Sequence, residues 1–201
     1  MNIKVCGITQ LKQLQQLDGL NIDFAGLDFQ KDSVRFLGDK IPADDLKESD
    51  FDVKKTGVFN NAEMIDMLDA IDAYGLDVIQ LNGNENTEVC ADLSEEVEVI
   101  KTFQLADEKM DIDEMVAEYD EVCDYYLFEN TAKKFDWKIL AKAKIEKPFF
   151  IGGVITVEDA AAIKKIKHPD FYGININTHF EKEPGVKDMG LILQLKKALG
   201  W

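Results

Sequence analysis

Two side chains of this sequence could move a proton, and each lies at the end of a short apolar run. Cys6 belongs to the run Ile3–Ile8, and Glu129 closes the run Tyr125–Glu129. A thiolate can take a proton and a carboxyl group can give one when both face the same substrate. The pair therefore indicates acid–base chemistry, although Cys6 could instead be a small buried hydrophobe and Glu129 a solvated loop residue.

Other residues are suited to holding an anion. Gly152 and Gly153 would let the backbone approach a phosphate group closely, and Asn177 and Thr178 could add side-chain donors. Arg35 could form a charge-assisted pair with a carboxylate. Each has a simpler explanation, because the glycines could form a tight turn and Arg35 a surface salt bridge.

Charge and composition exclude several classes of partner. The 201 residues include 39 acidic and 23 basic ones, which gives a formal net charge of −16, so we expect no nucleic-acid partner and no membrane binding. Two histidines and three separated cysteines, without a CxxC pair, argue against a metal site or a disulfide framework. The first residues lack the pattern of a signal peptide, so we expect a cytoplasmic protein.

Eight short apolar runs are expected to form the strands that position these residues. Their starts lie 20 to 30 residues apart, which is the length of a strand, a helix and two loops. Near-continuous apolar runs are typical of a parallel sheet covered by helices. The runs are Ile3–Ile8, Phe24–Phe29, Lys54–Phe59, Asp77–Leu81, Val97–Phe103, Tyr125–Glu129, Pro148–Ile151 and Phe171–Ile176.

The segments between the runs have the apolar spacing of helices. We expect Thr9 to cap the first helix. Asn60 or Asn61 is expected to cap a later helix, whose apolar stripe includes Met64 and Ile65.

Further residues mark helix boundaries. Gly19 and Gly75 are predicted to end helices, and Thr156 and Asp188 to begin the last two. Residues 41–51 have the weakest pattern, so we expect only a short or irregular helix there.

Eight strand–helix units in one chain of this length fit two architectures, a closed (β/α)₈ barrel or a doubly wound open sheet. The open sheet would normally have a GxGxxG fingerprint after its first strand, but Cys6–Thr9 reads CGIT. The uniform repeats also favour the barrel, and we expect residues 1–201 to form a single domain. In a barrel the functional residues lie at the carboxyl ends of the strands.

Several segments carry a more specific signal, and their order along the chain matters. The segments are KVCGIT at 4–9, SVRF at 33–36, GVF at 57–59, QLNGNE at 80–85, FDW at 135–137, GGV at 152–154, NTHFE at 177–181 and PGVKD at 184–188. In this order they resemble the phosphoribosylanthranilate isomerases, the (β/α)₈ enzymes of tryptophan biosynthesis. The resemblance covers essentially the whole chain.

The resemblance implies an Amadori rearrangement of an aminoaldose to an aminoketose without cofactor or metal. Cys6 would be the general base, and Arg35 would hold the anthranilate carboxylate. The phosphate would lie against the segments Gly152-Gly153 and Asn177-Thr178. The partner implied is a small phosphorylated substrate, and we expect a monomer or a homodimer.

The sequence departs from the family at the acid and around it. Glu129 stands where the family has an aspartate, and it is expected to act as the general acid. The loop that follows, residues 130–134, lacks the family's glycines, and Lys133 or Lys134 could supply charge there. Asn82, assigned to substrate binding, replaces a histidine, and Asn175 replaces an aspartate.

Thr178 also departs from the family, since serine is common at that place. Two hypotheses follow from these departures. The chain is either a working isomerase with an unusual acid, or a diverged barrel that binds a phosphorylated ligand or acts on another sugar phosphate. Retention of Cys6 and Arg35 favours the isomerase.

Overall fold

A closed barrel of eight parallel strands forms the centre of the molecule in this computed structural model, which describes residues 1–106, 109–130 and 136–200. Each strand pairs with the next in the sequence, and β8 pairs with β1, so the barrel architecture is confirmed and the open sheet is excluded. The strands are β1 (Asn2–Cys6), β2 (Phe24–Asp28), β3 (Lys54–Phe59), β4 (Val78–Leu81), β5 (Glu98–Gln104), β6 (Tyr125–Asn130), β7 (Phe149–Gly153) and β8 (Phe171–Ile176).

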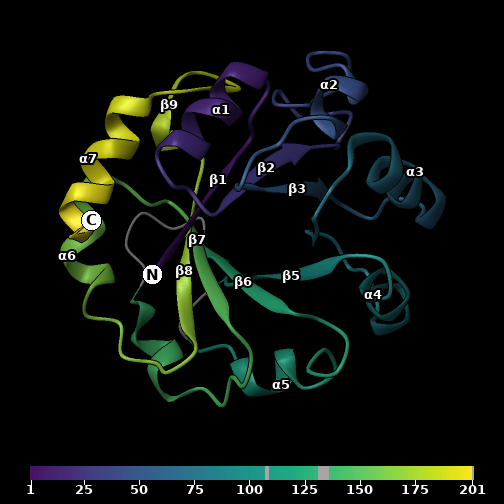
Figure 1. The fold of residues 1–201 in the computed structure, drawn as a ribbon. Helices are drawn as coiled ribbons and strands as arrows, with labels where there is room; N and C mark the ends of the chain where they lie inside the picture. Colours follow the sequence, from purple (N-terminus) through teal and green to yellow (C-terminus); the bar gives the residue numbers. More distant parts are fainter. Residues whose placement is uncertain (107–108, 131–135, 201) are drawn as a thin grey trace.

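The helices lie as a ring around the barrel, with α1 at the top of the view and α7 at the left (Figure 1). They are α1 (Leu11–Gly19), α2 (Ala43–Lys47), α3 (Met64–Tyr74), α4 (Thr87–Ser94), α5 (Ile112–Val116), α6 (Ala160–Ile163) and α7 (Met189–Leu199). The described residues also form three short 3₁₀ helices, η1 (Trp137–Lys142), η2 (Val157–Asp159) and η3 (Thr178–Phe180), and a small hairpin, β9 (Glu181–Glu183) with β10 (Val186–Lys187). Between β6 and β7 the described residues form only η1, in place of an α-helix.

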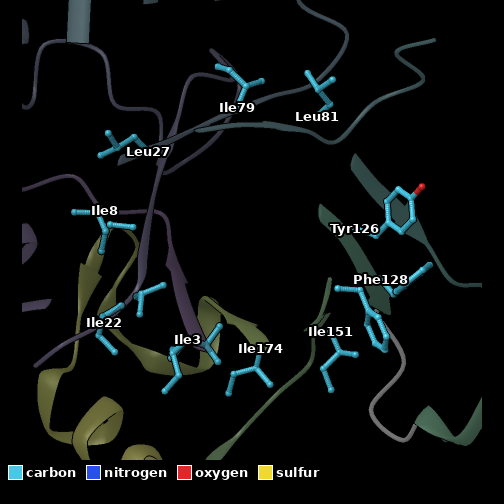
Figure 2. Packing of buried hydrophobic residues seen from close by; sticks show 14 of the residues in the cluster. Ile3, Ile8, Ile22, Leu27, Ile79, Leu81, Tyr126, Phe128, Ile151 and Ile174 are labelled. Carbon is cyan, nitrogen blue, oxygen red and sulfur yellow. The ribbon is translucent and has the colours of Figure 1, made fainter. Parts of the chain in front are cut away.

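The buried apolar residues form two cores, one around the outside of the barrel and one inside it. The larger core packs strands against helices and includes Ile3, Leu27 and Ile174 (Figure 2). The smaller one consists of buried strand residues alone and fills the barrel near the amino ends of its strands. Its members are Phe24, Val78, Ile100, Leu127 and Phe150. The polar residues near the carboxyl ends of the strands can therefore form a site above this smaller core.

Two predicted helix caps are wrong, because each side chain has a different partner. Gln10 occupies the cap position of α1, and the Thr9 hydroxyl donates to the carbonyl of Gly185 over 2.7 Å. Glu63 occupies the cap position of α3 without a side-chain cap. Asn61 lies before it, and its side-chain oxygen accepts from the backbone N–H of Asn84 over 2.7 Å. Tertiary bonds thus replaced the local ones that the sequence favours.

Other boundaries agree with the predictions. Gly75 ends α3 in the left-handed conformation, with φ of 59°, and Asp188 caps α7 by accepting from the backbone N–H groups of Gly190 and Leu191. The weak region contains only the five-residue α2. Helix α1 also ends at Gly19, which is its last helical residue, but Asn21 rather than the glycine takes the left-handed conformation, with φ of 49°.

The apolar stripe of α3 is rotated relative to the prediction. Ile65, expected to face the core, is 62% exposed, whereas Met67 and Ala70 are buried. Met64, Leu68 and Ile71 are only partly buried against the core.

Candidate active site

The predicted proton-transfer residues lie at the carboxyl end of the barrel. Cys6 ends β1, and its backbone pairs with that of Gly26 on β2. Cys6 is 7% exposed, and its thiol lies over Gly26, because a Cβ added to that glycine would be 2.7 Å from Sγ. Glu129 is on β6, where it pairs with Gly152 of β7. The barrel therefore brings both groups to the same rim, three strands apart.

A buried ion-pair network stands beside Cys6. Arg35 binds Glu181 side-on, through Nε to Oε1 at 2.8 Å and through Nη2 to Oε2 at 2.5 Å. Lys187 donates to the same carboxylate over 2.6 Å and to the Asn177 side-chain oxygen over 2.7 Å. Because Arg35 uses Nε and Nη2 for Glu181, its Nη1 hydrogens are the ones that can best be offered to a ligand.

The charged groups of this network shift one another's pKa values. Burial alone would raise the pKa of Glu181, but hydrogen bonds from Arg35, Lys187 and the Gly185 backbone lower it to about 2. The pKa of Arg35 is raised, chiefly by its hydrogen bond to Glu181 and to a smaller extent by the charge of Cys6. Burial lowers the pKa of Lys187, against the opposing effects of Glu181 and Cys6. Cys6 thus lies close enough to Arg35 and Lys187 for its charge to act on both cations.

The loop after β2 is fixed so that Arg35 reaches the rim. Asp28, at the end of β2, accepts a hydrogen bond from the Ser33 hydroxyl over 2.5 Å, and Ser33 accepts one from the Arg35 backbone over 3.1 Å. Gly7 has φ of +78°, and a Cβ there would lie 2.5 Å from Cδ of Arg35. Only glycine therefore lets the guanidinium pack beside Cys6.

Glu129 is held differently, by two neutral amides. Asn175 Nδ2 donates to Oε1 over 2.9 Å, and Gln104 Nε2 donates to Oε2 over 3.2 Å. Asn175 is buried on β8, whereas Gln104 is exposed at the end of β5. The carboxyl group is half-buried and lies next to Gly152, where a Cβ would be 3.0 Å from Oε1.

The predicted phosphate segments occupy the end of the barrel that connects these two groups. Gly153 has φ of +101°, and a Cβ there would lie 1.8 Å from the Asn130 carbonyl oxygen, so the backbones of β6 and β7 approach closely. Thr178 accepts from Nη2 of Arg35 over 3.5 Å, and Asn177 accepts from Lys187. Asn177 and Thr178 therefore belong to the cationic side of the rim.

Asn82 lies at the end of β4 with its side-chain oxygen already bonded. Gln80 donates to that oxygen over 2.6 Å and Thr102 over 2.8 Å. With two donors on the oxygen, Asn82 can best offer a ligand its Nδ2 hydrogens.

Several charged residues of the site were not assigned from the sequence. Glu181 and Lys187 lie within the segments NTHFE and PGVKD, but nothing in their spacing indicates that they meet Arg35. Lys4, two residues before Cys6, is fully buried inside the barrel. A lysine within a strand that otherwise reads as apolar was the available signal, because buried lysines need a specific partner.

Some predictions fall on residues 131–135, including Lys133, Lys134 and Phe135, which lie outside the described residues. Within the described ranges no cluster of His, Cys, Asp or Glu side chains could hold a metal ion, and no helix is long and apolar enough to cross a membrane.

A groove of about 950 Å³ lies between the loop after β2 and α3, lined by residues such as Phe29, Phe59 and Tyr74. It contains neither Cys6 nor Glu129, so it is separate from the site described above.

Comparisons with known proteins agree with this geometry. The family model for N-(5'-phosphoribosyl)anthranilate (PRA) isomerase matches residues 3–198. The N-(5'-phosphoribosyl)anthranilate isomerase of Parabacteroides distasonis is 38% identical over 94% of this chain and 89% of its own length. That of Phocaeicola vulgatus is 31% identical over 94% and 92%.

Two solved structures of isomerases with this name have a similar fold. A phosphoribosyl anthranilate isomerase in complex with reduced 1-(o-carboxyphenylamino)-1-deoxyribulose 5-phosphate is 26% identical, with a TM-score of 0.83 over 99% of this chain and 98% of that one. A dimeric enzyme of this name from Thermotoga maritima, solved as monomers, is 25% identical with the same TM-score over the whole of both chains. The chain belongs to the N-(5'-phosphoribosyl)anthranilate isomerase family.

Proposed function

We propose that this chain isomerises N-(5'-phosphoribosyl)anthranilate to the corresponding aminoketose in tryptophan biosynthesis, with Cys6 as base and Glu129 as acid. Family membership supports the reaction. The observation that carries the residue assignment is that a thiol beside the cations Arg35 and Lys187 and a carboxyl held by neutral amides lie at one end of a single barrel. The reaction needs one group of each kind.

Two proton transfers begin the proposed reaction. The Glu129 carboxyl gives its proton to the ribose ring oxygen as the bond from that oxygen to C1′ breaks, and the nitrogen lone pair forms an iminium ion. The Cys6 thiolate then takes the C2′ proton, and the electrons of that C–H bond form the enolamine. Return of a proton to C1′ and loss of the enol proton give the ketone, so the reaction consumes nothing else.

The remaining site residues would bind the two ends of the substrate. Arg35 would hold the anthranilate carboxylate through the hydrogens that Glu181 does not use. Gly152 and Gly153 would offer backbone to the phosphate, together with the segment Asn177-Thr178. Charge supports this division, since an anionic substrate needs a local positive field on a chain with a net charge of −16.

The wider assignments also remain proposals. We propose that residues 1–201 act as one cytoplasmic domain, as a monomer or a homodimer, with a phosphorylated small molecule as the partner. A structural relative is described as dimeric. Light scattering of the purified chain distinguishes the two oligomeric states.

The test is turnover of freshly generated phosphoribosylanthranilate, followed by loss of its fluorescence, with Cys6→Ala measured alongside. Removal of the base should lower kcat by about a hundredfold or more. The melting temperature should change little, because the substitution removes only one sulfur atom from the protein.

Turnover that does not depend on Cys6 would remove this residue from the mechanism. If the wild-type chain shows no turnover, while phosphorylated ligands still raise its melting temperature, the chain is a diverged barrel that kept an anion site and lost the reaction.

A further inference from the structure

Lys4 places a positive charge inside the barrel, below the rim. Its side chain is fully buried on β1, and Nζ donates to the side-chain oxygen of Asn175 over 3.4 Å. Nζ also lies over Gly26, where a Cβ would be 3.0 Å from it and 2.7 Å from Sγ of Cys6. A charge buried in this way is costly unless its partners are fixed, so the position of Lys4 requires a structural or chemical reason.

Asn175 connects this lysine to the proposed acid. Its register on β8 places it directly beside Lys4 of β1. Its oxygen accepts from the ammonium group, which can only donate, and its Nδ2 donates to Oε1 of Glu129 over 2.9 Å. The two partners therefore allow only one orientation of the amide.

The second amide at Glu129 offers a comparison within the same carboxyl group. Gln104 donates to Oε2 over 3.2 Å from an exposed position, where water can replace it. Asn175 is 3% exposed and is tied to Lys4, so its hydrogen bond is the one that fixes the carboxyl group. Glutamate has one more rotatable bond than aspartate, and such a side chain needs a fixed contact to keep its carboxyl in place.

We propose that Lys4 and Asn175 are a pair of positioning residues for the acid: Lys4 orients the Asn175 amide, and the amide holds the Glu129 carboxyl in reach of the ribose ring oxygen. This inference rests on the proposed function of Glu129. When Glu129 gives up its proton, the Nδ2–H group of Asn175 already points at the oxygen that becomes anionic, so no group has to reorganise. The lysine remains one residue away and does not pair with the acid directly.

The test compares kcat and KM of Asn175→Ala with those of Asn2→Ala. Asn2 is the matched control, because it is an amide on β1 that bonds the Tyr172 carbonyl on β8 over 3.3 Å, at the opposite end of the same strand pair. Asn175→Ala should lower kcat about 10- to 100-fold and change KM less than about twofold. Asn2→Ala should leave both constants near the wild-type values.

Two further variants separate positioning from a general loss of structure. Asn175→Asp keeps the shape and the Lys4 partner but, as a carboxylate, offers no donor, so kcat should fall as far as in Asn175→Ala. Gln104→Ala should lower kcat by less than about threefold. Lys4→Met and Asn175→Ala should not be additive, because they remove successive members of one chain of contacts.

The decisive measurement is Asn175→Ala in a Glu129→Gln background, where it should have no further effect on kcat. An equal additional loss there would overturn the proposal, since Asn175 would then act on another group. Wild-type kcat in Asn175→Asp or Asn175→Ala would also overturn it, while the proposed acid stands as long as Glu129→Gln is slow. Full turnover by Glu129→Gln alone would overturn both the acid and its positioning.

Discussion

The two sides of the rim hold their carboxyl groups in opposite ways. Next to Cys6, Glu181 receives hydrogen bonds from two cations, Arg35 and Lys187, and its pKa falls to about 2. Across the rim, Glu129 receives its hydrogen bonds from the neutral amides of Asn175 and Gln104. The same functional group is thus part of an ion-pair network at one place and of an amide network at the other.

The difference follows from what each carboxyl group has to do. A carboxylate locked between cations stays ionised, so it can position Arg35 but cannot deliver a proton. An acid has to lose and regain its proton, and the two side chains that hold Glu129 are amides rather than cations. The interposed Asn175 keeps the Lys4 charge out of direct contact with Glu129.

The largest effect is expected from removing the proton of the amide-held carboxyl. Glu129→Gln should lower kcat by about 10²- to 10⁴-fold, whereas Glu129→Asp should keep or improve activity, because the carboxyl group remains. Steady-state kinetics of both variants checks this. Equal rates in the two variants would defeat the assignment of Glu129 as the acid.

A backbone change on the same side should be next in size. Gly153→Ala should destabilise the protein by more than about 3 kcal/mol, because it requires φ of +101° and puts Cβ within 1.8 Å of the Asn130 oxygen. Urea unfolding measures the loss. Gly19→Ala is the control, since nothing lies within 4 Å of its added Cβ, and it should gain about 0.5 kcal/mol. Similar values for the two variants would contradict the close approach of β6 and β7.

The ion pairs of Glu181 should make the free energy of unfolding depend on pH in the acid range. The pKa of Glu181 is lowered from 4.5 to about 2, so the unfolded chain binds more protons between these values. Its contribution, about 3 kcal/mol, is fully present above pH 4.5 and is lost as the pH falls towards 2. Unfolding free energies measured across this range should depend less on pH in Glu181→Gln. A slope that is identical to that of the wild type would show that Glu181 does not carry the effect.

The smallest effect is expected for the side-on pair itself. Arg35→Lys should raise KM about 10- to 100-fold with a smaller change in kcat, because a point charge cannot bind Glu181 and a substrate carboxylate with separate edges. Lys47→Met removes a surface pair with Asp72, whose side chain is 89% exposed, and should change neither KM nor stability noticeably. An unchanged KM in Arg35→Lys would exclude Arg35 from carboxylate binding.

The predictions that failed are those that rested on local preferences alone. Thr9 and Asn61 have good capping side chains, but each bonds a loop that is distant in sequence. The buried face of α3 is likewise set by what packs against the helix, so Ile65 is exposed although it fits an apolar stripe. Cap and stripe preferences are worth about 1 kcal/mol or less, and tertiary contacts override them.

The sequence by itself determined the strands, the barrel and the rim positions of Cys6 and Glu129, because strand spacing and apolar pattern are local properties and barrel closure brings all carboxyl ends together. Only the tertiary structure decided that Arg35 meets Glu181 and that Lys4 meets Asn175. These partners are 146 and 171 residues apart in the sequence, and no local pattern records which side chains meet once β8 has closed onto β1.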